Sequence, residues 1–170
     1  FVTAEESVES AWAQVENQYQ RRADLIPNLV NTVQGAADFE QETLQSVIEA
    51  RSRATSITLQ ADDLNDPAKI QQFQAVQEQL SGALSRLLVS VERYPELKAN
   101  ANFRDLQAQL EGTENRIATE RKRFNDTARQ YNTDIRKFPG SLIASITGFD
   151  RKAYFEANEG AEQPPLVDFE

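Results

Sequence analysis

The sequence predicts an all-α protein, an antiparallel bundle of about four long helices with a kinked first helix and an irregular C-terminal tail. Only 6 of the 170 residues are glycine and 6 are proline. Between them the chain is rich in Ala, Gln, Glu, Leu and Arg, which favour helices. Apolar residues recur at steps of three and four, whereas the alternation typical of β-strands is nearly absent. Long helices with short connections pack antiparallel.

The first helix is expected at about residues 4–34. Thr3 and Glu6 have the spacing of a capping box, in which each side chain binds a free backbone amide. Pro27 lacks an amide hydrogen and clashes with the preceding turn, which predicts a kink near residues 23–27. A heptad seam, apolar except for its arginine, comprises Val8, Trp12, Val15, Tyr19, Arg22, Ile26, Leu29 and Val33.

The second helix is expected at about residues 39–59. Gly35 is a plausible stop for the first helix, and Asp38 with Gln41 has the spacing of a second capping box. The alternative is one continuous bent helix across Gly35, because an isolated glycine costs only about 1 kcal/mol. The residues expected to face inward are Leu44, Val47, Ile48, Ala54 and Leu59.

After a loop at 60–67, the third helix is expected at about residues 67–93. Asp66 can cap its first turn, and Pro67 suits the first helical position. Pro95 ends it, because the residue before a proline is pushed out of the helical region. The predicted seam is Ile70, Phe73, Gln77, Leu80, Leu84, Leu87, Val91 and Tyr94.

The fourth helix, expected at about residues 101–138, is the longest. Asn100 or Asn102 caps it, and a four-residue step near 117–121 is a stutter in the repeat. A short helix at 142–147 completes a bundle domain at 1–157, and an extended tail follows at 158–170. The seam is Phe103, Leu106, Leu110, Thr113, Ile117, Arg121, Phe124, Ala128, Tyr131, Ile135 and Phe138.

Three polar residues, Arg22, Gln77 and Arg121, occupy seam positions whose neighbours are apolar. A buried charge is costly unless it is paired, and Glu114 is a natural partner for either arginine. The group forms either a binding or proton-handling site or a structural polar layer that fixes helix register. We favour the structural interpretation.

A second set of polar residues, here called the polar stripe, follows the first helix beside its seam. Asparagine is a mediocre helix former, so three in one stripe indicate side-chain hydrogen bonding. The stripe faces a polar interior, another protein or water; in the first case Asn115, Asn125 and Asn132 of the fourth helix are the opposing set. The stripe, our candidate partner-binding site, is Asn17, Arg21, Asp24, Asn28 and Asn31.

The composition argues against an enzyme. The chain has no cysteine and no histidine, which removes the thiol nucleophile, the usual metal ligand and the commonest general base. No P-loop, GxSxG or GxGxxG motif is present. Glu111 and Glu114 are spaced like paired carboxylates, but such pairs are usually solvated. We therefore expect no catalytic residue, metal or cofactor.

The charge of the chain further limits the classes of partner that it can bind. The formal net charge of −9 disfavours nucleic acids and anionic lipids. Basic residues gather at 116–137, which we interpret as a solvated face with paired charges rather than a basic binding patch. No run of 18 apolar residues occurs that could span a bilayer.

Several long motifs cover nearly the whole chain. They are Trp12 with Asn17-Gln-Tyr-Gln-Arg-Arg-Ala-Asp-Leu-Ile-Pro-Asn-Leu-Val-Asn31, Tyr94-Pro-Glu-Leu-Lys-Ala-Asn100 with Asn102-Phe103, Gly112-Thr-Glu-Asn-Arg-Ile117, Tyr131-Asn132 with Phe138-Pro139, Gly148-Phe149, Tyr154-Phe155 and Pro164-Pro165. These motifs resemble the LemA family and show no clear departure from the family pattern, apart from the missing N-terminus.

The resemblance implies a bacterial protein with a bundle of long helices and an N-terminal hydrophobic anchor, either a transmembrane helix or a lipoprotein-type signal. An anchor just before Phe1 would explain a sequence that lacks methionine. One relative in magnetotactic bacteria is associated with building magnetosome membranes. The family supplies no catalytic residues to carry over.

Together these observations predict a non-catalytic scaffold in the bacterial cell envelope, tethered by a single anchor and extracytoplasmic, which binds an unidentified protein partner. Long seams can close within one chain or across a homo-oligomer, and the sequence pattern is the same in both cases. The alternative is a protein that self-assembles on the bilayer or remodels it; an enzyme of unrecognised type is a remote third.

Overall fold

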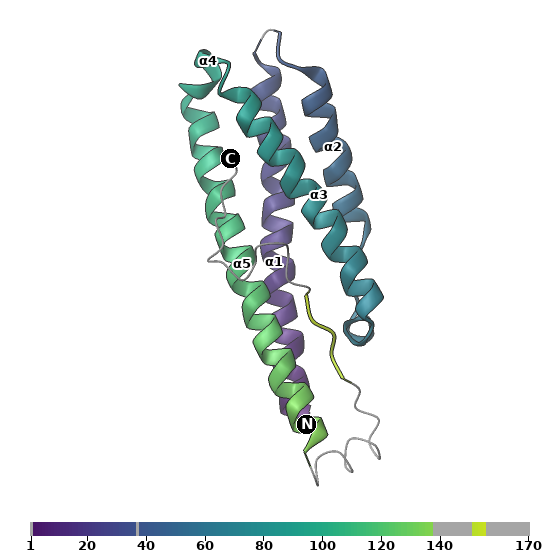
Figure 1. Cartoon of the computed structure of the whole chain (residues 1–170). Coiled ribbons are helices and arrows are strands. Elements are labelled where there is room, and N and C mark those ends of the chain that lie inside the picture. Colours follow the sequence, from purple (N-terminus) through teal and green to yellow (C-terminus); the bar gives the residue numbers. More distant parts are fainter. Residues whose placement is uncertain (1, 37, 138–150, 156–170) are drawn as a thin grey trace.

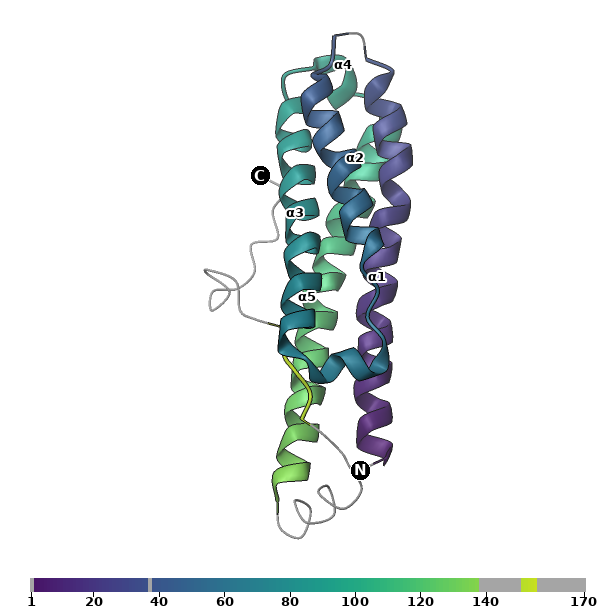
Figure 2. The same cartoon turned by 90° about the vertical axis from the view of Figure 1, so that its right-hand side faces the viewer.

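In the computed structural model, which describes residues 2–36, 38–137 and 151–155, four long helices run antiparallel side by side (Figures 1 and 2). The predicted all-α bundle is confirmed. A 3₁₀ turn, η1, and a four-residue helix, α4, lie in the connections and were not predicted. The elements are α1 (Val2–Gln34), α2 (Gln41–Ser56), η1 (Ala61–Asn65), α3 (Pro67–Val91), α4 (Pro95–Lys98) and α5 (Ala101–Arg136).

Two of the predicted helix caps are correct. The Asp66 side chain accepts the Ala68 amide at 3.0 Å, with Pro67 in the first position of α3. The Asn100 side chain accepts the Phe103 amide at 3.0 Å and caps α5. Each acceptor satisfies one of the backbone amides that a helix start leaves free.

The two capping boxes predicted for the first and second helices are wrong. Because α1 already begins at Val2, Thr3 is helical rather than a cap. Asp38 has a φ of 68°, in the left-handed region, and α2 starts after Glu40 without a side-chain cap. The Tyr94 hydroxyl donates to the Asp38 carbonyl at 3.2 Å, so a tertiary contact sets this turn.

Gly35 ends α1, as predicted, and the alternative of one continuous helix across it is wrong. A β-carbon at Gly35 would lie 3.2 Å from the Thr32 carbonyl oxygen, which disfavours larger residues in this turn. Upstream, α1 is continuous through Pro27. The kink predicted near 23–27 stays a prediction.

The buried faces follow the predicted seams closely. In the seam predicted for the third helix, all members are buried except Tyr94, which lies beyond the end of α3 and is half-buried. In the seam predicted for the fourth helix, Arg121 is half-buried and Phe138 lies outside the described residues. Ile48 is a wrong prediction, since it is 39% exposed. It follows the buried Val47 by one residue, which turns it about 100° around the helix. The predicted helix at 142–147, the tail at 158–170 and the domain end at 157 lie outside the described residues.

The core divides into two clusters. The aliphatic half lies at the end that holds the α1–α2 turn and α4, and it is built from all four long helices. Its large members include Ile26, Leu29, Val33, Leu44, Val47, Leu80, Leu84, Leu87, Phe103 and Leu110.

The aromatic half lies at the other end, beyond the end of α2. There α1, α3 and α5 are joined by Leu59, by Leu64 of η1 and by the segment 151–155, drawn yellow-green in Figure 1. Its large members include Trp12, Tyr19, Phe73, Phe124, Tyr131 and Phe155.

Candidate functional site

A buried arginine joins the helices at the junction between the two halves. Arg22 is 1% exposed and forms an ion pair with Glu114 of α5. It also donates to the Gln77 backbone oxygen at 3.0 Å and side-chain oxygen at 2.8 Å, and to the Ser81 hydroxyl at 2.6 Å. Gln77 in turn donates to the Ala54 carbonyl of α2 at 3.3 Å.

This network contains three of the four residues predicted as the structural polar layer. Ser81, which the sequence analysis missed, donates to Glu114 at 3.2 Å. Its position four residues after Gln77 on the same helix face is the signal that could have revealed it. Since the Arg22 charge is paired inside the chain, the arrangement supports a register-fixing layer more than a ligand site.

Arg121, the fourth predicted member, does not join the network. It forms an ion pair with Glu78 at 3.1 Å, and its guanidinium lies 4.9 Å from the Phe155 ring centroid. The seven residues between Glu114 and Arg121 correspond to about 10 Å along α5. Arg121 therefore belongs to the aromatic half.

A second arginine compensates for Pro27 inside α1. In a helix the amide of residue 27 would bind the carbonyl of Ala23, but proline has no amide hydrogen. The Arg51 Nε of α2 donates to that Ala23 oxygen at 2.8 Å. The proline thus creates a free carbonyl on α1 that α2 satisfies, which links the two helices beside the junction.

The polar stripe lies on the outer side of α1. Each member follows a buried seam residue by two positions, or about 200° around the helix. All of its residues are exposed, so the expected interior network with α5 is wrong. Asp24 accepts a hydrogen bond from Gln20 at 2.8 Å within the same helix. The stripe therefore faces a partner or water.

The asparagines expected opposite the stripe have other contacts. Asn115 is exposed. Asn125 and Asn132 bind the backbone of the segment 151–155, a contact that the sequence analysis missed. Their seven-residue spacing, which places both on one face of α5, was the available signal.

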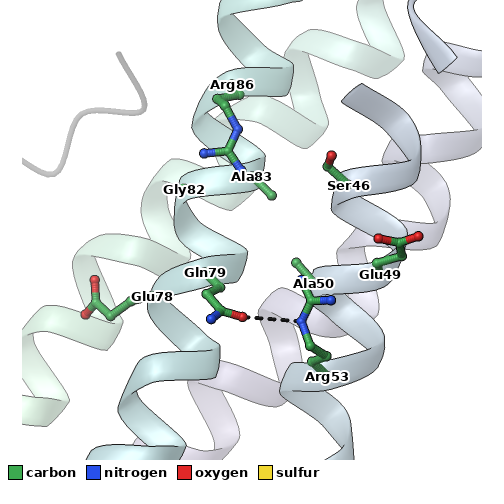
Figure 3. A pocket seen from close by; sticks show the side chains of 9 residues that line it. All are labelled: Ser46, Glu49, Ala50, Arg53, Glu78, Gln79, Gly82, Ala83 and Arg86. Atoms are coloured by element: carbon green, nitrogen blue, oxygen red, sulfur yellow. Dashed lines mark hydrogen bonds between the residues drawn. The ribbon is translucent and has the colours of Figure 1, made fainter. Parts of the chain in front are cut away.

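A shallow groove of about 400 Å³ lies between α2 and α3. Figure 3 shows Arg53 reaching Gln79, to which its Nε donates at 3.3 Å. The small residues Ala50, Gly82 and Ala83 open the groove. Because both signs of charge surround it, the groove suits a polar contact better than an apolar ligand.

The basic stretch at 116–137 is partly paired. Arg121 binds Glu78, Arg123 binds Glu120 at 3.2 Å, and Arg129 binds Asp126 at 3.1 Å. Such pairs are expected of a solvated helix face with paired charges.

Within residues 2–36, 38–137 and 151–155, no three His, Cys, Asp or Glu side chains are grouped to hold a metal ion. Of the helices in the described part, none combines the length and apolar character needed to cross a membrane. The carboxylates of Glu111 and Glu114 do not act as a pair, because Glu111 is exposed and Glu114 binds Arg22.

A model of the LemA family matches residues 11–169, nearly the whole chain. The chain belongs to the LemA family. The motifs and the bundle of long helices agree with this LemA assignment.

Curated relatives extend the comparison. Magnetosome protein MamQ of Magnetospirillum gryphiswaldense is 28% identical over 98% of this chain and 67% of its own length. Magnetosome protein MamQ 2 of Paramagnetospirillum magneticum is 27% identical over the same shares. Protein LemA of Metamycoplasma hominis is 22% identical over 89% of this chain and 65% of its own length. None of these names states an enzymatic activity.

Proposed function

We propose that this LemA-family chain is a non-catalytic, membrane-tethered scaffold of the bacterial cell envelope, and that the polar stripe on α1 binds another protein. The observation that carries the proposal is that all five residues of the stripe are exposed on a 33-residue helix. On an exposed face, where packing does not choose the residue, strong helix formers are the favoured choice. Asn17, Asn28 and Asn31 each weaken the helix relative to alanine, so a role outside the chain accounts for them better.

An anchor that precedes residue 1 would set the height of the stripe above the membrane. At 1.5 Å per residue, an upright α1 would hold residues 17–31 roughly 25–45 Å from the anchor. That distance exceeds the reach of lipid headgroups. The stripe would then be presented to a protein rather than to the bilayer.

The test is covalent crosslinking in intact cells with the full-length anchored protein and the triple variant Arg21→Ala, Asp24→Ala, Asn28→Ala. The variant is expected to fold, because all three side chains are exposed. We expect the native protein to capture a defined protein that the variant loses.

A matched control lies on α5, where Arg104, Asp105 and Asn115 are exposed and Gln109 donates to Asp105 at 2.7 Å. Changing these three to alanine removes similar charges and a similar hydrogen bond. The control should keep the capture. If the stripe variant captures the same proteins as the native chain, the stripe is not the binding face.

A second proposal is a protein that organises the membrane itself. Among the described residues, the exposed Arg116, Lys122 and Lys137 form no ion pair, so their charges can face a membrane surface. The net charge of −9 opposes adsorption to anionic lipid. Flotation with vesicles that contain phosphatidylserine tests this second proposal. Salt-sensitive binding that is lost in the double variant Arg116→Glu, Lys122→Glu would favour it, and the absence of binding would contradict it.

A further inference from the structure

The segment 151–155 is held against α5 much as a β-strand is held by its neighbour. The Asn132 side chain accepts the Lys152 amide at 2.7 Å and donates to the Lys152 carbonyl at 2.8 Å. The Asn125 side chain does the same for Phe155, at 2.9 and 3.4 Å. A carboxamide offers both an acceptor and a donor, so each asparagine satisfies one whole residue of backbone.

The spacing of the two asparagines fits an extended chain. Seven residues of α-helix rise about 10.5 Å, whereas three residues of extended chain, from 152 to 155, cover about 10 Å. The Ala153 amide between them donates to the Leu64 carbonyl of η1 at 2.8 Å. Together α5 and η1 bind the backbone of an extended segment that runs antiparallel to α5.

Side chains add sequence specificity at both ends of the segment. The Phe155 ring stacks on Trp12 with centroids 5.7 Å apart and meets Phe124 edge-on at 5.5 Å. At the other end, the Lys152 Nζ donates to Glu5 at 2.9 Å and lies 5.4 Å from the Tyr131 ring centroid. The surface of α1, α5 and η1 that holds the segment, here called the segment site, thus selects an extended stretch with a cation followed by an aromatic residue three positions later.

We propose that the segment site is a docking site for residues 151–155 of a second copy of the chain, so that two copies exchange the segment. Every contact described above joins the site to the segment itself, so a segment from another molecule would make the same contacts, as in domain swapping. Residues 138–150 connect the segment to α5, and 13 residues can span at most about 45 Å. A second copy is the one partner certain to carry the matching lysine and phenylalanine.

The concentration of the chain decides whether the segment binds within its own chain or to a second copy. Within one chain the segment has a high effective concentration, which favours the folded-back arrangement in dilute solution. When copies are crowded on one surface, the concentration of segments from other copies rises and competes with the chain's own segment. The segment site depends neither on the polar stripe nor on a membrane anchor.

The experiment uses Trp12, the single tryptophan of the chain, as its reporter. The recipient chain carries Phe155→Ala, so its Trp12 loses the stacked ring and its emission should shift to longer wavelength. The donor chain carries Trp12→Phe, Asn125→Ala and Asn132→Ala. It therefore has no tryptophan emission, and its own segment site is weakened. Mixing the two at high concentration should return the emission towards the native wavelength and produce a species of dimer mass.

A second donor that also carries Phe155→Ala is the control and should leave the emission unchanged. A peptide of residues 150–157 replaces the donor chain if the triple variant does not fold. Recovery with the peptide but not with a folded donor chain would overturn exchange between copies, and would leave the segment as an internal strap. No recovery with either would overturn the docking site itself.

Discussion

In the aliphatic half, four long helices surround mostly leucine, isoleucine and valine; in the aromatic half α2 has ended, and large rings with an extended segment fill its place. Where four helices enclose the core, branched aliphatic side chains are large enough to fill the space between them. Where α2 has ended, the other core cluster is built around large rings. Trp12, Phe124 and Phe155 pack against one another there, with ring centroids 5.5–5.7 Å apart.

The boundary between the halves is polar. Arg22, Gln77 and Glu114 lie at the level where one cluster stops and the next begins on α1, α3 and α5. Because a charge network is satisfied in one alignment of the helices and left unpaired in others, it penalises sliding that an apolar seam would tolerate. The difference teaches that one bundle can combine two kinds of packing when a polar layer fixes the helices between them.

The largest expected effect tests whether the halves are separate. Phe124→Ala should lower the free energy of unfolding by about 4 kcal/mol and change the Trp12 emission, because a fully buried ring beside Trp12 is lost. Leu84→Ala in the aliphatic half should cost about 3 kcal/mol and leave the emission unchanged. Denaturant titration with fluorescence measures both; an equal emission change in Leu84→Ala would break the comparison.

The next effect concerns the boundary. Glu114→Gln should lower the free energy of unfolding by about 3 kcal/mol, because it leaves the buried Arg22 charge without a counter-charge. The double variant Arg22→Met, Glu114→Leu should recover most of this loss. Asp126→Asn, in an exposed pair, is the control and should cost less than about 1 kcal/mol. No loss in the unfolding midpoint of Glu114→Gln would refute the paired layer.

A smaller effect is expected at the link between α1 and α2. Arg51→Met should cost about 2 kcal/mol, because it leaves the Ala23 carbonyl without a donor. In a Pro27→Ala background the restored amide can bind that carbonyl, so the same change should cost much less. A double-mutant cycle by denaturant titration measures the coupling; additive effects would show that Arg51 does not compensate for the proline.

The smallest effect depends on pH. Burial raises the pKa of Tyr19 in the folded chain, and this outweighs the lowering by the Arg121 and Arg22 charges. The unfolded tyrosine therefore ionises first, and stability should fall as pH rises through about 10. The stability of Tyr19→Phe should fall less steeply than that of the native chain. Unfolding midpoints between about pH 9 and 11 measure this; identical slopes in the two chains would contradict it.

The sequence by itself determined the helices and the faces they bury. The seams from Val8 to Val33, Ile70 to Val91 and Phe103 to Ile135 predicted the core, because a step of three to four residues places side chains on one helix face. The sequence also showed that Arg22 and Gln77 would be buried among apolar neighbours. It also named Glu114 as a partner for Arg22 or Arg121, but it could not decide between the two arginines, since Glu114 is 92 residues from Arg22 along the chain.

Only the tertiary structure decided the contacts that depend on how the helices are aligned. It placed Arg51 against the carbonyl that Pro27 leaves free, and it assigned Asn125 and Asn132 to the segment 151–155. Helical periodicity fixes the direction of each side chain around its own axis. It carries no information on which distant carbonyl, carboxylate or backbone stretch lies opposite, because that follows from the packing of the whole chain.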